Sequence, residues 1–156
     1  VSKEVGLGAI KYFDLAHNRT SDVIFRWEDV LSFEGNTGPY IQYTYARLRS
    51  ILRRAGEFTP VFSDHFDLDH EERGLLLHCL RLPEAMERVC DTWSPHLLAS
   101  FLFDLAQKTN EFYHSHPILS QEDEQKKLFL LMLVQVVVLT LASGLHLLGI
   151  DAPKEM

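Results

Sequence analysis

The longest apolar run in the chain predicts a buried helix near its C-terminal end. Residues 128–150 contain no Asp, Glu, Lys or Arg, and a helix that is apolar on every side is typical of the middle of a bundle. The stretch 128–142 is shorter than the ~20 residues that a membrane span needs, and it includes Gln135 and Thr140. We therefore expect a core helix that is capped by Ser120, carries acidic residues at its start and ends at Gly149.

A second helix is predicted at 39–55, where the pattern separates into two faces. A loop rich in turn-forming residues precedes it, with Asn36 or Thr37 as the cap and Pro39 in the first turn. At 100° per residue, the face that we expect to pack on the protein consists of Ile41, Tyr45, Leu48 and Leu52. The roughly opposite face carries Tyr40, Tyr43, Arg47 and Arg54.

Apolar spacing and prolines predict the remaining helices at about 1–17, 67–82, 84–93 and 95–114. Asp67 or Asp69 is the expected cap of the second of these, and Ser94 of the fourth. The residues of 84–93 that we expect to face inward are Met86, Val89, Cys90 and Trp93. Residues 18–22 and 56–66 are expected to be loops, 23–27 is a short β-type run, and 28–31 is predicted to form a helical turn. The predicted fold is all-α: about five helices from Pro39 onward, with an N-terminal appendage.

Composition narrows the function classes. The chain has 156 residues and a net charge of −7, which argues against a nonspecific nucleic-acid binder but leaves room for an RNA site of a few arginines and aromatic rings. Cys79 and Cys90 are not spaced as a metal or redox pair, so we expect both to be buried in a reduced, cytoplasmic protein. No signal peptide is visible, and the first residues lack a helix cap, as expected of a segment taken from a longer protein.

Candidate catalytic and metal-binding groups do not assemble into a site. His114 and His116 could join His65, His70 or His78, but no second ligand pair has metal-site spacing, so we expect no metal. The two cysteines fall on apolar stripes, which favours burial over nucleophilic catalysis. The acidic residues are explained by a solvated loop and a helix N-terminus; they are Asp64, Asp67, Asp69, Glu71 and Glu72. The glycines at 6 and 8, and at 35 and 38, fit no phosphate-loop pattern.

The Tyr/Arg face of 39–55 has two interpretations. Tyrosines at helical spacing more often belong to a core, and arginines on a helix are more often simply solvated. Flat rings and planar cations beside a glycine-containing loop also suit stacking on bases and contact with phosphates. Periodicity alone favours the first interpretation.

Longer motifs favour the second interpretation. The segment SFEGNTGPYIQY (32–43) is similar to the junction loop S-F-E-G-N/D-T-G/A-P-Y-x-Q-Y of class I arginyl-tRNA synthetases. The stretch PHLLASFLFDLAQKTNEFYHSHPIL (95–119) and the ending LLGIDAPKEM (147–156) resemble later parts of the same family. Residues 6–33 resemble the end of that family's catalytic domain.

The resemblance implies two domains and a role in tRNA charging. Residues 1–38 would be the end of the catalytic domain with its connecting loop, and 39–156 an α-helical anticodon-binding domain. The implied partners are an arginine tRNA and the missing catalytic domain in cis, and no membrane or metal is expected. ATP and Mg²⁺ would serve the whole arginine–tRNA ligase, whereas no cofactor is expected in these residues. Because the class's nucleotide-binding motifs are absent, we expect the isolated chain to be inactive. The alternative is a helical protein-interaction or regulatory module without RNA binding; a stand-alone enzyme is disfavoured.

The resemblance also assigns individual residues to a slot for the central anticodon base. Those residues are Tyr40, Tyr43, Arg47, Tyr113 and Met156, with further contacts to the anticodon loop from Phe33, Gly35, Asn36 and Thr37. The tail departs from the family, since Lys154 and Glu155 reverse the usual acidic-then-basic order, so an ion-pair role for the tail does not follow. We expect Tyr40, Tyr43, Tyr113 and Met156 to lie near one another at the surface; burial of the two helix tyrosines apart from Tyr113 would favour a plain core.

Overall fold

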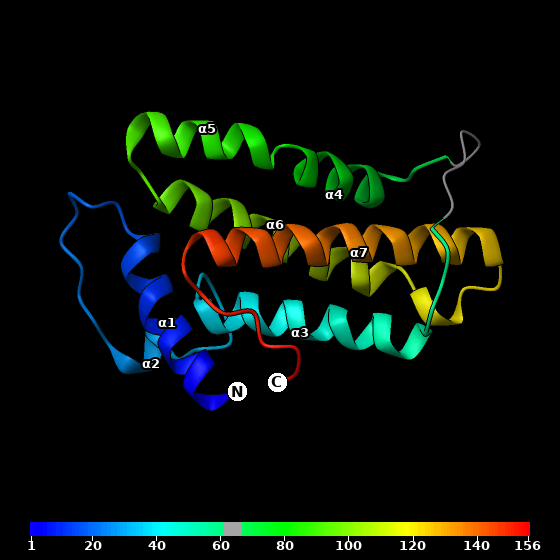
Figure 1. Cartoon of the computed structure of the whole chain (residues 1–156), viewed down its shortest axis with the longest axis horizontal. Coiled ribbons are helices and arrows are strands. Elements are labelled where there is room, and N and C mark those ends of the chain that lie inside the picture. Colours follow the sequence, from blue (N-terminus) through cyan, green and yellow to red (C-terminus); the bar gives the residue numbers. More distant parts are fainter. Residues whose placement is uncertain (61–66) are drawn as a thin grey trace.

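The computed structural model describes residues 1–60 and 67–156, and every regular element within them is a helix (Figure 1). The predicted loop 56–66 therefore falls partly outside the described residues, as do Asp64 and His65. The elements are α1 (Ser2–Ala16), α2 (Trp27–Val30), α3 (Gly38–Ala55), α4 (His70–Leu80), α5 (Leu82–Thr92), α6 (His96–Ser115), the 3-10 helix η1 (Ile118–Ser120) and α7 (Glu124–Leu147). The predicted all-α class is confirmed, with five α-helices from Pro39 onward in the described part of the chain.

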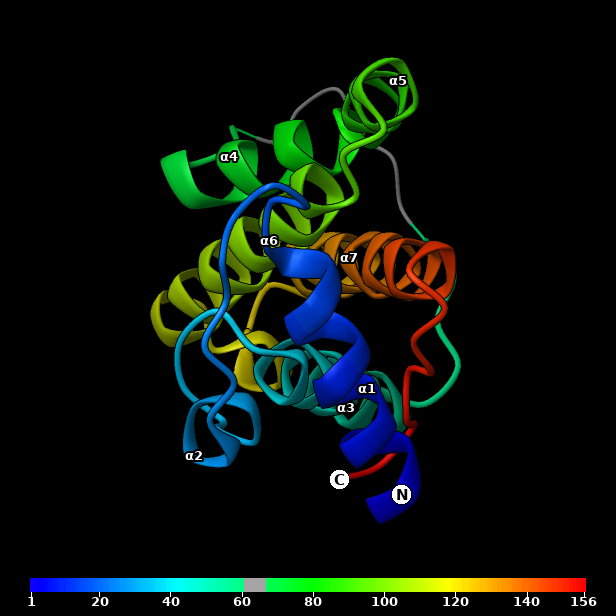
Figure 2. The ribbon, with the colours of Figure 1, turned by 90° about the vertical axis from the view of Figure 1, so that its left-hand side faces the viewer.

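The helices form layers with α7 in the middle. In Figure 1, α3 lies on one side of α7, and α4 and α5 lie end to end on the other, above α6. Figure 2 shows α1 crossing the start of α3, with α2 and its loops beside it. The red C-terminal segment returns past α3 on the side away from α6.

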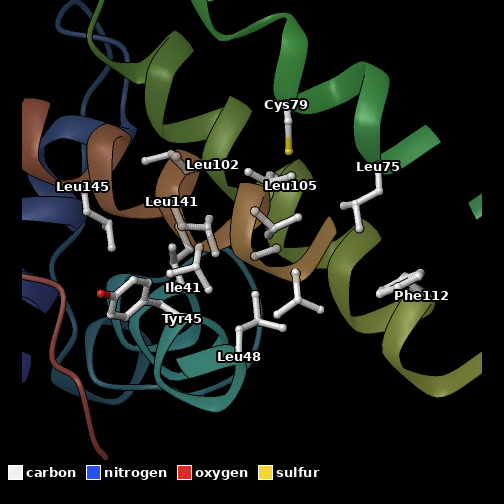
Figure 3. Packing of buried hydrophobic residues seen from close by; sticks show 14 of the residues in the cluster. Ile41, Tyr45, Leu48, Leu75, Cys79, Leu102, Leu105, Phe112, Leu141 and Leu145 are labelled. Atoms are coloured by element: carbon white, nitrogen blue, oxygen red, sulfur yellow. The ribbon is translucent and has the colours of Figure 1, made fainter. Parts of the chain in front are cut away.

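The apolar character of α7 is explained by this central place. Leu130, Leu133, Val137 and Leu141 are fully buried, although α7 is long and apolar enough to span a membrane by length and composition. Figure 3 shows side chains of α3, α4 and α6 converging on α7 in one cluster. The prediction of a core helix at this position is confirmed for the side that faces α3, α4 and α6, but not for the whole circumference, because Leu139 is 60% exposed.

Glycine allows two pairs of helices to approach closely. A Cβ on Gly38 would lie 2.9 Å from both the Gly8 carbonyl oxygen and the Tyr12 Cβ, so α1 and α3 cross with little space between their backbones. A Cβ on Gly144 would collide with the Leu102 side chain, so α6 and α7 also approach closely there. The α1–α3 crossing fixes the loop that precedes α3.

The helix caps agree with the sequence in two places and differ in two. Thr37 caps α3, and Asp69 caps α4 in a capping box with Glu72. The predicted cap Ser120 is wrong, because η1 intervenes and Asp123 accepts hydrogen bonds from the first N–H groups of α7. Ser94 is also wrong as a side-chain cap, since its hydroxyl donates to the Thr92 carbonyl instead.

Residues 23–27 do not form the predicted β-type run. They have no regular secondary structure before Trp27, which begins α2, and no strand pairs with them among the described residues. A strand requires a partner for its backbone hydrogen bonds. Their aromatic side chains instead pack edge to face, with Phe25 5.3 Å from Phe13 and 4.8 Å from Trp27 between ring centroids. The helical turn predicted at 28–31 is confirmed in α2.

The inward face predicted for α5 is only partly correct. Met86 and Val89 are half-buried, but Cys90 is exposed and Trp93 is 77% exposed. The reason is that α5 is an outer helix whose apolar side is only partly covered, and Trp93 ends it in the left-handed conformation with φ 52°. Cys79 is buried as expected, and burial raises the pKa of its thiol to about 11.

Candidate nucleic-acid interface

The outer face of α3 presents aromatic and cationic side chains at the surface. The Thr37 hydroxyl accepts a hydrogen bond from the Tyr40 N–H at 3.2 Å, which starts the helix. Tyr43 is then 44% exposed, whereas Tyr40 and Arg47 are half-buried. The helix therefore holds one exposed ring, that of Tyr43, beside two partly covered side chains.

Helix α6 fixes the orientation of Tyr40. The Asn110 amide donates to the Tyr40 hydroxyl at 2.8 Å, and the Tyr40 ring lies 5.7 Å from that of Phe103. Asn110 also lies 3.4 Å from the Thr44 hydroxyl. The sequence places Asn110 with Tyr113 among the residues that the long helix adds to the RNA contact, but it does not reveal that Asn110 orients Tyr40. Nothing in the sequence distinguishes Phe103 from other apolar residues of the helix.

Arg47 and Tyr113 join α3 to α6 at the surface. The Arg47 guanidinium carbon lies 4.0 Å from the centroid of the Tyr113 ring, a cation–π contact. Stacking leaves the edge of a guanidinium free to donate hydrogen bonds. The arrangement therefore combines a positive charge, a planar surface and hydrogen-bond donors.

In the loop before α3, some side chains hold the loop in place and one is exposed to solvent. The Thr37 hydroxyl donates to the Ser32 carbonyl at 2.6 Å, and the Asn36 side-chain oxygen lies 2.6 Å from the Tyr12 hydroxyl. Gly35 adopts φ +77°, which glycine tolerates readily. Phe33 is 53% exposed, with its ring 6.3 Å from that of Tyr43. Asn36 and Thr37 thus shape the loop, and Phe33 extends the aromatic surface.

Tyr12 supports this loop from the interior. It is fully buried, and its hydroxyl also lies 2.9 Å from the Ala99 carbonyl on α6. Burial, together with nearby Asp104, raises the pKa of Tyr12 well above its usual value, so the hydroxyl keeps its proton. The loop is therefore tied to α1 and, through Tyr12, to α6.

The C-terminal segment lies along α3. The Gln42 amide donates to the Asp151 carbonyl at 2.8 Å. Further along, Arg53 donates to the Lys154 carbonyl at 2.9 Å and pairs with the Glu155 carboxylate at 3.2 Å. An ion pair therefore does hold the tail, although the residue order departs from the family pattern.

The structure places the predicted site residues as follows. Tyr40, Arg47 and Tyr113 lie at the α3–α6 seam, linked by the contacts above, and Tyr43 lies next to Phe33 on the loop side. Met156 is 41% exposed at the end of the tail, beside α3 (Figures 1 and 2). Contact of these residues with RNA stays a prediction.

A separate cluster joins the start of α4 to the end of α6 and the start of α7. His116 Nε2 lies 2.6 Å from Asp69 Oδ2 and 3.7 Å from Glu72 Oε1, a grouping that could hold a metal among the described residues. Lys126 Nζ lies 2.6 Å from the fully buried Glu72 carboxylate, so a cation of the protein already neutralises it. Burial acts to raise the pKa of Asp69, but hydrogen bonds from the Glu72 N–H and His116 outweigh it and lower that pKa. We interpret the cluster as a partly exposed ion-pair network built on the buried Glu72 carboxylate.

Comparison with known proteins relates the chain to a domain family and to longer relatives. The family model described as the DALR anticodon binding domain matches residues 41–156. The chain is 44% identical over 158 residues to the arginine–tRNA ligase of Saccharophagus degradans, and 39% identical over 159 residues to that of Fusobacterium nucleatum. Each alignment covers 100% of this chain but 27% and 28% of the relative, respectively.

Solved structures give the same relation. The arginyl-tRNA synthetase of Thermus thermophilus superposes with a TM-score of 0.90 at 40% identity, over 99% of this chain and 27% of that one. The arginyl-tRNA synthetase of Plasmodium falciparum gives a TM-score of 0.86 at 30% identity, over 99% of this chain and 28% of that one. The chain therefore spans about a quarter of the length of these relatives.

Proposed function

The chain belongs to the DALR anticodon-binding domain family, and from that premise we propose that it is the part of an arginine–tRNA ligase that recognises the tRNA anticodon. The observation that carries the proposal is the Arg47–Tyr113 contact at 4.0 Å, beside the exposed ring of Tyr43. A single-stranded base is recognised by stacking on aromatic rings and guanidinium planes and by hydrogen bonds to its edges. This surface offers each of those groups.

The proposed roles follow from exposure and contacts. The exposed ring of Tyr43 stacks on the central anticodon base, while Tyr40, held by Asn110, forms the wall beside it. Arg47 donates to the base or a neighbouring phosphate while it rests on Tyr113. Phe33 contacts the adjoining part of the anticodon loop. Met156, exposed at the end of the tail, is assigned to the edge of the slot by the family resemblance and not by a contact with the other residues.

Residues 1–38 would complete the catalytic domain of the same enzyme. Nine large apolar side chains in this segment are at least two-fifths exposed. Apart from Val1 at the terminus and Phe33 in the loop before α3, they are Leu7, Ile10, Val23, Ile24, Phe25, Trp27 and Leu31. Exposed apolar surface of this extent is typical of an interface. The relatives supply about three times as much additional chain, so we propose that their catalytic portion covers this surface in cis, and that ATP and Mg²⁺ act there.

The test separates recognition from chemistry in the full-length ligase. With Tyr43→Ala, we expect the charging of arginine tRNA to fall about 5- to 150-fold, which corresponds to the ~1–3 kcal/mol of one stacked base. Arginine activation should change much less, and Tyr43→Phe is the matched control that keeps a ring. Equal loss of charging and activation would mean that Tyr43 is structural.

A second measurement concerns the isolated chain. It should not charge tRNA, and it should bind an anticodon stem-loop of arginine tRNA more tightly than the same stem-loop with an altered central base. Charging by the isolated chain would contradict an exclusive role in recognition. Equal binding of the two RNAs by both the isolated chain and the full-length ligase would favour a protein-interaction module.

A further inference from the structure

A groove of about 750 Å³ opens next to the Tyr113 end of this interface. Its walls come from the second half of α3, through Ile51 and Arg54, from the end of α6, through Tyr113 and His114, and from η1. The volume lies within the roughly 300–1,000 Å³ of small-ligand sites. It is large enough for one nucleotide.

The groove is continuous with the stacking surface. Tyr113 lines it and also supports the guanidinium of Arg47. Ile51 and Arg54 follow Arg47 by four and seven residues, about one and two helical turns, so they continue the same side of α3. A single strand that places one base at Tyr43 can therefore continue along α3 into the groove.

The charge of the groove suits a phosphate. The chain has 22 acidic and 15 basic side chains, yet no Asp or Glu lines this groove. Arg54 and His114 are exposed, and no hydrogen bond or ion pair engages Arg54 within residues 1–60 and 67–156. A guanidinium without a protein partner is available for charge-assisted hydrogen bonds to phosphate oxygens.

The opposite wall is apolar and firmly held. Pro117 and Leu119 present partly exposed carbon surface. The His116 ring stacks on Phe112 at 4.5 Å between ring centroids, and its Nε2 is hydrogen-bonded to the Asp69 carboxylate. Because these contacts occupy His116, the groove residues left to meet a ligand's phosphate are the Arg54 cation and the His114 imidazole, which can donate a hydrogen bond.

We propose that this groove is a second nucleotide subsite, which holds the nucleotide adjacent to the central anticodon base. Its phosphate lies on Arg54, with His114 nearby, and its base packs against Pro117 and Leu119. This assignment rests on the function proposed for the Tyr40–Tyr43 surface.

The phosphate contact is tested by the binding of a fluorescent anticodon stem-loop of arginine tRNA to the full chain. Arg54→Gln should weaken binding about three- to tenfold and reduce the slope of log affinity against log salt by about 0.7–1. Arg88→Gln on α5 is the matched control, with the same change of charge away from the groove. Equal effects of Arg54→Gln and Arg88→Gln would overturn the phosphate contact.

The base contact is tested with stem-loops that lack the base on either side of the central anticodon position. Removal of one of these two bases should weaken binding to the wild-type chain severalfold, but not to Ser120→Trp, in which an indole fills the groove. Thermal melting of each variant shows that it is folded. Wild-type binding that is unaffected by either removal would overturn the subsite.

The two proposals can fail separately. If the chain still prefers the correct central base, but the Arg54 and Ser120 variants bind RNA like the wild type, only the second subsite is rejected. If neither the wild-type chain nor the full-length ligase prefers the correct central base, both the proposed function and the second subsite are rejected.

Discussion

The two sides of α3 meet opposite requirements within one helix. On the inner side, Ile41 and Leu48 are 0% and 2% exposed, and they pack against α7 among other aliphatic side chains (Figure 3). On the outer side, Tyr43 is 44% exposed, and Arg47 rests on a ring rather than in the core. The inner side determines where the helix lies, and the outer side determines what it presents.

This difference shows how a few half-exposed side chains can form a specific surface. A binding residue keeps its geometry when the element that carries it is packed and its own rotamer is held by neighbours. The inner side provides the first condition, and Asn110, Tyr113 and Phe33 provide the second. Substitutions on the two sides should therefore separate stability from RNA binding.

The largest effect is expected on the inner side. Leu48→Ala should lower the free energy of unfolding by about 2–5 kcal/mol, because it removes buried methyl groups and leaves a cavity. Urea denaturation measures this loss. RNA affinity, measured at a temperature where the variant is still folded, should stay close to that of the wild type. A decrease of less than about 1 kcal/mol in the free energy of unfolding would show that the inner side is poorly packed.

The seam between α1 and α3 comes next. Tyr12→Phe should cost about 1–3 kcal/mol of stability, because it removes a buried hydroxyl that contacts both the Ala99 carbonyl and the Asn36 side-chain oxygen. Denaturation compares this variant with Tyr43→Phe, whose hydroxyl lies on an exposed ring. Equal stability of the two variants would mean that the loop before α3 does not depend on Tyr12.

On the outer side, Asn110→Ala should affect binding rather than folding. Tyr40 loses a hydrogen bond that water replaces in part, so we expect RNA affinity to fall about 2- to 13-fold, or ~0.5–1.5 kcal/mol. Tyr40→Phe should give a similar loss, and the double variant little more. Fully additive losses would show that Asn110 acts independently of Tyr40.

The smallest effect concerns the tail. Glu155→Gln breaks an ion pair whose side chains are 44% and 73% exposed, and such pairs contribute about 0.2–1 kcal/mol. RNA affinity should fall by at most about fivefold relative to Glu87→Gln on α5, which removes the same charge elsewhere. The difference between these variants should shrink at high salt; a salt-independent difference would indicate that the ion pair is not its cause.

Sequence patterns predicted the elements whose environment is set by local order. The faces of α3, the burial of α7 and the Asp69 cap are visible as periodicity and residue type, and all three are confirmed. The family resemblance, which rested on longer motifs such as residues 32–43, is also confirmed by the comparisons.

The errors arose where another part of the chain decides the outcome. Periodicity places Cys90 and Trp93 on one side of α5 but does not reveal whether a neighbour covers that side. Residues 23–27 have strand-like composition but no strand to pair with in the described structure. Ser120 and Asp123 are both good caps, and the turn η1 determines which one begins α7.

Gln42 has a consequence for the order of events during synthesis. Its amide holds the carbonyl of Asp151, which lies 109 residues later in the chain. At ribosomal speeds of about 5–20 residues per second, α3 is complete roughly 5–20 s before that partner exists. During this interval the inner side of α3 lacks α7 to pack against, and the Gln42 amide lacks its acceptor. The nascent chain therefore carries α3 without its tertiary contacts. We expect cooperative closure of the domain only after α7 and the segment behind it have emerged.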